Sequence, residues 1–109
     1  MRKISSKSAK TALKKYQKKY ADTSPLTAAS VITFDKLRKF DKRIRLRRII
    51  EGYETLIKSI DRLNWVIDTE FAEGDAFKKE RYDDWKDRIS KAEDYIAWAK
   101  AGRGEPQYF

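Results

Sequence analysis

The chain has 109 residues and a formal net charge of +9, with 26 Lys or Arg against 17 Asp or Glu. This length fits one small domain. It contains no cysteine and no histidine, which excludes disulfides, thiolate chemistry and the commonest general base and transition-metal ligand. No stretch approaches the ~18 apolar residues of a membrane span. We therefore expect a single domain that works inside the cell, in the cytoplasm, and not in a membrane.

The first predicted element is a basic helix over residues 8–20. Ala9, Leu13, Tyr16 and Tyr20 recur on one side of it, and lysines occupy most of the rest. Residues 1–20 carry eight Lys or Arg and no acidic residue. Such a composition also occurs in transit peptides, but one Arg against seven Lys favours a helix of the folded domain.

A short turn over residues 25–32 is predicted to lead into a long helix over residues 34–73. Ser24 and Pro25 are typical of a helix start, and Thr33 is a suitable cap for the long helix. Apolar residues then recur with alternating spacings of three and four, which is the heptad pattern of a coiled coil. The residues of this seam are Leu46, Ile49, Tyr53, Leu56, Ile60, Leu63 and Ile67.

A second heptad-patterned helix is predicted over residues 76–101, after Gly74 ends the long helix and Asp75 caps the next one. Its seam is Tyr82, Trp85, Ile89, Ala92, Ile96 and Ala99. Two such helices joined by a tight turn predict an antiparallel, coiled-coil-like hairpin over residues 46–101. Residues 102–109, with two glycines and a proline, are expected to form a flexible tail. The predicted class is all-α and elongated.

The net positive charge comes entirely from residues 1–48, which we treat as a basic module. Residues 36–48 hold eight Lys or Arg and one Asp, whereas residues 49–109 carry a net charge of −4. The last helix should reach back only to about Arg48, so the start of the long helix should project ~20 Å beyond the hairpin. We expect the first helix to cover the apolar residues Leu37, Phe40 and Ile44 there; alternatively, that helix is disordered and a partner covers them.

The basic module predicts nucleic-acid binding through phosphate contacts, because Arg and Lys match phosphate groups and Asn and Gln, which read bases, are scarce there. An acidic protein partner is the alternative, with the chain acting as an adaptor, a viral or mobile-element assembly protein, or an inhibitor. A helix-turn-helix is disfavoured because almost no turn separates its two elements. The candidate contacts are Lys14, Lys15, Lys18, Lys19, Arg38, Lys42, Arg43, Arg45, Arg47 and Arg48.

Catalysis has little support. Glu51 and Glu54 lie one turn apart, and Asp83, Asp84 and Asp87 cluster on the side of the last helix opposite its seam. A di-metal site in a helical bundle needs inward carboxylates and usually histidine. A solvated acidic face explains these residues better, so we expect no enzyme activity, no cofactor and no metal.

The apolar residues outside the two seams predict self-association. Trp65, Tyr95 and Trp98 lie beside or off the seams, where large aromatic side chains are typical of an interface. A chain this small also gains apolar burial by forming an oligomer. We therefore expect a homo-oligomeric helical bundle.

Overall fold

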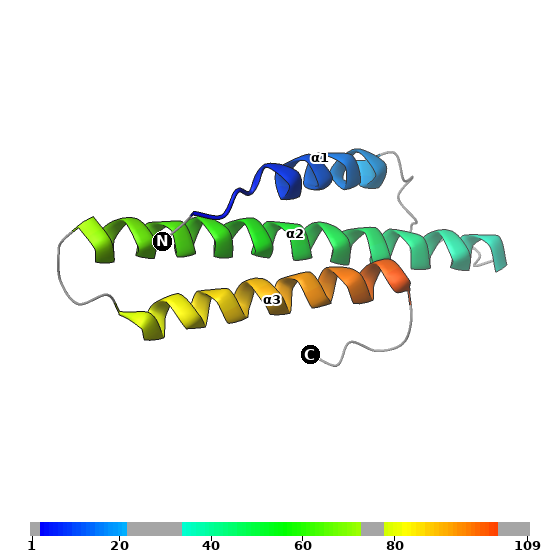
Figure 1. Cartoon of the computed structure of the whole chain (residues 1–109). Coiled ribbons are helices and arrows are strands. Elements are labelled where there is room, and N and C mark those ends of the chain that lie inside the picture. Colours follow the sequence, from blue (N-terminus) through cyan, green and yellow to red (C-terminus); the bar gives the residue numbers. More distant parts are fainter. Residues whose placement is uncertain (1–2, 22–33, 73–77, 103–109) are drawn as a thin grey trace.

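The structure, a computed structural model, describes residues 3–21, 34–72 and 78–102, without the side chains of residues 34–40, 71 and 72. These residues form three helices, α1 (Lys7–Ala21), α2 (Phe34–Ala72) and α3 (Lys79–Ala101) (Figure 1). The predicted all-α class is confirmed. The expected turn over 25–32, the corner at Gly74 and Asp75, and the tail from residue 103 onward lie outside the described residues.

The long helix α2 is the axis of the molecule, and α1 and α3 each lie along it (Figure 1). The molecule measures 63 × 26 × 21 Å, and α2 accounts for the long dimension because 39 residues span ~58 Å at 1.5 Å per residue. Both shorter helices therefore depend on α2 for the apolar surface against which they pack.

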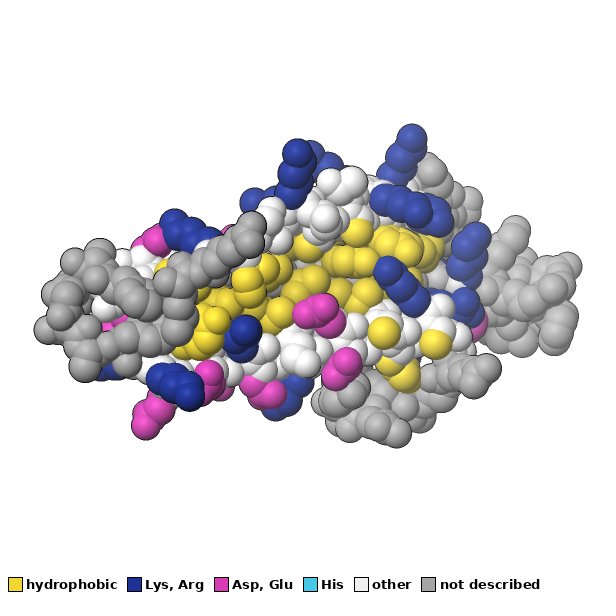
Figure 2. Space-filling model, in the orientation of Figure 1, with side chains coloured by type: hydrophobic (Ala, Val, Ile, Leu, Met, Phe, Trp, Pro, Cys, Tyr) yellow, Lys and Arg dark blue, Asp and Glu magenta, His cyan; other side chains and the backbone are white. Residues whose placement is uncertain are grey.

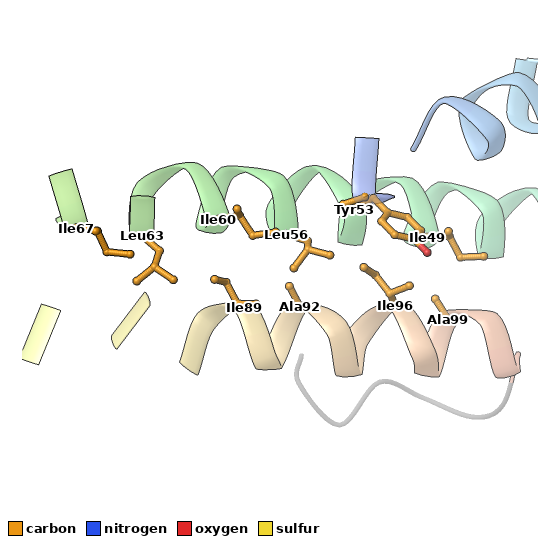
Figure 3. Packing of buried hydrophobic residues seen from close by; sticks show 11 residues of the cluster. Ile49, Tyr53, Leu56, Ile60, Leu63, Ile67, Ile89, Ala92, Ile96 and Ala99 are labelled. Atoms are coloured by element: carbon orange, nitrogen blue, oxygen red, sulfur yellow. The ribbon is translucent and has the colours of Figure 1, made fainter. Parts of the chain in front are cut away.

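The two heptad seams form the main core between α2 and α3 (Figure 3). Leu63 is 0% exposed, and Ile60 and Ile96 are each 4% exposed. Arg81 Nη1 lies 3.0 Å from Glu70 Oε1 at one end of the contact, and Lys100 Nζ donates to Tyr53 Oη over 2.7 Å at the other. Polar contacts therefore join α2 and α3 at two levels along their shared core.

A close approach between α2 and α3 occurs at Gly52. This glycine is buried in the middle of a helix, where a residue with a side chain would have the better helix propensity. A Cβ atom at Gly52 would lie 2.5 Å from Ile96 Cγ1 and 3.1 Å from Tyr95 Cδ1. The missing side chain is what allows α3 to pack this near to α2.

Helix α1 is fixed to α2 at three levels. The side-chain amide of Asn64 accepts from the Ile4 backbone N–H over 3.0 Å and donates to the Ile4 carbonyl over 2.9 Å. Farther along, the Tyr16 and Tyr53 rings stack with centroids 5.8 Å apart. The third level is Tyr20, which contacts Arg43. The segment therefore runs along α2 from the level of Asn64 toward its basic start.

The expected cover of Leu37, Phe40 and Ile44 by α1 stays a prediction. The apolar side of α1 joins the main core, where Ala9 is buried and Leu13 and Tyr16 pack at its edge. The physical reason is that Tyr53 and Ile57 widen the apolar seam of α2 enough for a second helix to share it. The side chains of Leu37 and Phe40 lie outside the described residues, and Ile44 is half-buried.

Helix α3 ends level with the basic part of α2. Gly102 adopts the left-handed conformation with φ of 67°, and its N–H donates to the Trp98 carbonyl over 3.2 Å, a common helix end. A Cβ at Gly102 would lie 2.9 Å from the guanidinium carbon of Arg45. Residues 34–44 therefore extend ~16 Å past α3 at 1.5 Å per residue, as Figure 1 shows for the start of α2.

Candidate nucleic-acid interface

Basic side chains of α1 gather near its C-terminal end. Lys14, Lys15, Lys18 and Lys19 are all exposed. The Nζ atoms of Lys15 and Lys19 lie 5.8 and 5.5 Å from the centroid of the Tyr16 ring. They lie one helical turn apart, so they flank the same ring and place two ammonium groups beside the aromatic pair of Tyr16 and Tyr53.

Lys100 of α3 reaches the same aromatic pair. Its Nζ lies 5.5 Å from the Tyr16 centroid and 5.2 Å from the Tyr53 centroid. The hydrogen bond that Lys100 donates to Tyr53 raises its pKa above the usual value for lysine. Lys100 was not among the residues predicted from the sequence. The signal that could have found it is its place in the last turn of α3, which pairs with α2 near Arg48.

Arg43 and Arg47 of α2 meet α1 through Tyr20. The guanidinium carbon of Arg43 lies 5.6 Å from the Tyr20 centroid. Hydrogen bonds donated by Arg43 and then Arg47 lower the pKa of the Tyr20 hydroxyl below that of an ordinary tyrosine. This contact joins the basic end of α1 to the basic end of α2.

Arg45 and Arg48 project toward α3 instead. Arg48 lies with its guanidinium carbon 5.0 Å from the Trp98 ring, a cation–π contact. Arg45 lies against the end of α3 at Gly102 and pairs with Asp41 over 2.8 Å. Lys42 is exposed, and the side chain of Arg38 lies outside the described residues.

The described basic residues near the start of α2 do not lie on a single face of the helix. Lys42, Arg43, Arg45, Arg47 and Arg48 are five of seven consecutive positions, and successive residues turn by about 100°. They therefore point in several directions around the helix, as their separate contacts with α1 and α3 show. The start of α2 presents positive charge on several sides.

Few carboxylates oppose this charge. Among the described residues, Arg45 of the predicted basic set forms an ion pair with Asp41. Acidic residues of α3 pair within their own helix: Asp84 with Arg88 over 3.1 Å and Asp87 with Lys91 over 3.0 Å. Figure 2 shows dark blue side chains over α1 and near the start of α2, and magenta side chains mainly along α3.

The three aromatic residues predicted to form a self-interface are not brought together. Trp65 is 44% exposed on α2, with the Arg62 guanidinium carbon 4.2 Å from its ring. Tyr95 and Trp98 contact each other on α3, with centroids 5.7 Å apart. Tyr95 packs at the level of Gly52, and the thirteen residues from there to Trp65 correspond to ~20 Å along α2.

A shallow groove lies beside Tyr95 on the α2–α3 surface. Its volume is about 360 Å³, and its lining residues are Glu51, Gly52, Thr55, Arg88, Lys91, Ala92 and Tyr95.

The two carboxylates Glu51 and Glu54 are exposed. Among the residues that the structure describes, no three acidic side chains come near enough together to hold a metal ion, and no helix is long and apolar enough to cross a membrane.

No protein-family model, no curated protein and no solved structure matches this chain significantly. A functional conclusion must therefore come from its own residues.

Proposed function

We propose that this protein binds nucleic acid through the phosphate backbone, with little preference for base sequence. The observation that carries the proposal is that basic side chains from all three helices lie along the half of α2 that begins at Phe34. Lys15 and Lys19 of α1, Arg43 and Arg47 of α2, and Lys100 of α3 surround the Tyr16, Tyr20 and Tyr53 rings.

Phosphate contact explains these residue types better than base reading does. Arginine binds phosphate oxygens through two parallel N–H groups, and lysine acts as a mobile point charge. Asn and Gln, which pair with adenine edges, are nearly absent from the basic end, where α1 holds only Gln17. Positive charge on several sides of α2 suits a polyanion that surrounds or wraps this end, and its affinity should depend on salt.

The framework for this surface is an antiparallel hairpin of α2 and α3, which we propose acts only as a binding scaffold and not as an enzyme. Copies of the chain associate through the side of α3 that carries Tyr95 and Trp98. The support for this association is that Trp98 is only half-buried despite its contact with Arg48. Pairing of two copies would double the number of basic ends available to one polyanion.

A comparison of two variants, each lacking three positive charges, tests the proposal. Lys42, Arg43 and Arg47 would be replaced together by Gln, which keeps helix propensity nearly unchanged. A control with the same change in net charge replaces Lys58, Lys79 and Lys86, which are exposed elsewhere on α2 and α3. Fluorescence anisotropy with a random 20-base-pair duplex measures the affinity of each variant.

The first set should weaken duplex binding at least 10-fold more than the control set, since each lost phosphate contact costs about 1 kcal/mol or more. Equal losses from both sets would show that only net charge matters and would contradict a defined interface. Failure of the wild-type protein to bind the duplex, together with binding to a polyglutamate chain, would favour the acidic protein partner instead.

A further inference from the structure

Three ammonium groups from two helices surround a single aromatic ring. The Nζ atoms of Lys15, Lys19 and Lys100 lie 5.8, 5.5 and 5.5 Å from the centroid of Tyr16. Tyr16 is half-buried and Tyr53, on which it stacks, is buried. The core therefore holds the two rings in place, whereas all three lysines are exposed residues.

Two of these lysines, Lys15 and Lys100, are not paired with an acidic side chain of the described residues. Lys15 and Lys19 are also spaced one turn apart on α1, where like charges weaken a helix. An anion placed among the three ammonium groups would remove this repulsion and gain charge-assisted hydrogen bonds.

The contact of Lys100 with Tyr16 also links α3 to α1. Each of these helices packs along α2, and within the described residues no Cα atom of α1 lies within 8 Å of a Cα atom of α3. The contact of Lys100 with Tyr16 crosses that gap through side chains. A group that bound Lys15 and Lys19 on one side and Lys100 on the other would join α1 to α3.

We propose that a phosphate group of the nucleic-acid backbone binds among Lys15, Lys19 and Lys100, over the Tyr16–Tyr53 pair, and couples binding to the docking of α1. The identity of this ligand rests on the function proposed above. Phosphate fits because its several oxygen acceptors can accept from three separate donors at once. Because the ligand binds only the folded arrangement, it stabilises the folded state in proportion to its concentration.

The test compares thermal melts with and without two probes at constant ionic strength: a random 16-base-pair duplex and inorganic tripolyphosphate. The variant is Lys15→Gln combined with Lys100→Gln. The matched control is Lys86→Gln, because Lys86 of α3 also lies over a tyrosine ring, with its Nζ 5.3 Å from the Tyr82 centroid. The control removes a lysine that also lies over a tyrosine ring but is fourteen residues from Lys100 along α3.

At duplex concentrations ten times Kd, the wild-type melting temperature should rise by about 5 °C. The Lys15→Gln/Lys100→Gln variant should lose at least half of that rise and bind the duplex about 10-fold more weakly, whereas Lys86→Gln should keep both. Without ligand, Lys15→Gln alone should leave the melting temperature unchanged or raise it, because it relieves repulsion. With the duplex present, the melting temperature of Lys15→Gln should be lower than that of the wild-type protein.

Each other outcome has a distinct meaning. An unchanged duplex-induced rise in the double variant overturns this phosphate site and leaves nucleic-acid binding by the Arg residues intact. A rise with tripolyphosphate that needs Lys15 and Lys100, without any duplex binding, supports the anion site but assigns it to a free oligophosphate and overturns the proposed function. No rise with either probe overturns the site.

Discussion

Replacing Gly52 with Ala should destabilise the protein, although Ala is the better helix former. The new Cβ atom would lie 2.5 Å from Ile96 Cγ1 and 3.1 Å from Tyr95 Cδ1, well inside the ~3.5–4.0 Å of normal carbon contact. Relieving such overpacking costs about 1–3 kcal/mol. The gain in helix propensity returns about 1 kcal/mol. The free energy of unfolding should therefore fall by up to about 2 kcal/mol.

A double-mutant cycle with Ile96→Ala separates the two effects. Removing the Ile96 side chain deletes the atom that the new Cβ would meet most closely, so the propensity gain should dominate in that background. Gly52→Ala should then become neutral or stabilising by up to about 1 kcal/mol. Urea denaturation followed by circular dichroism, at one fixed protein concentration, measures all four variants. A stabilising effect of Gly52→Ala in the wild-type background would refute the close approach of α2 and α3.

Asn64→Ala should lower the free energy of unfolding by about 1–3 kcal/mol, because both backbone groups of Ile4 lose their partner. The same substitution should speed amide hydrogen exchange in α1 more than in α3. An equal increase in the exchange rates of both helices would contradict this docking of α1. Tyr20 should ionise at a lower pH than an ordinary tyrosine in an ultraviolet titration, since the hydrogen bonds from Arg43 and Arg47 lower its pKa. Tyr20→Phe should remove that early phase, and an unchanged curve would argue against the contact. Trp98→Ala should lower the mass measured by light scattering if copies associate through α3; a wild-type protein that stays monomeric at high micromolar concentration would exclude this association.

The helices of the core could be predicted closely because their signal is periodic. The α2 seam from Leu46 to Ile67 and the α3 seam from Tyr82 to Ala99 were visible as heptads, and all but the half-buried Tyr82 and Trp85 are buried. The docking of α1 could not be predicted in the same way. The pairing of Asn64 with Ile4 uses backbone groups of an extended segment, and such contacts carry no repeating sequence pattern.

The candidate site was predicted in part for a related reason. The clustering of Lys and Arg in the first 48 residues was evident, and the contact between Tyr20 and Arg43 joins its two parts. Lys100 was missed because it belongs to residues 49–109, whose net charge is negative. The net charge of a long segment does not show where a single lysine lies. The directions of Arg45, Arg47 and Arg48 depend on where α1 and α3 end beside α2, which only the packed structure provides.

The salt dependence of duplex binding tests the central claim most directly. Anisotropy titrations of a random duplex between about 50 and 300 mM salt should give a linear plot of log K against log[salt], with a slope of about −4 to −6 for five or six neutralised phosphates. Replacing Lys42, Arg43 and Arg47 by Gln should make the slope shallower by about 2–3, and scrambling the duplex sequence should leave it unchanged. Affinity that does not fall with salt, or that differs strongly between scrambled duplexes, would contradict binding through the phosphate backbone.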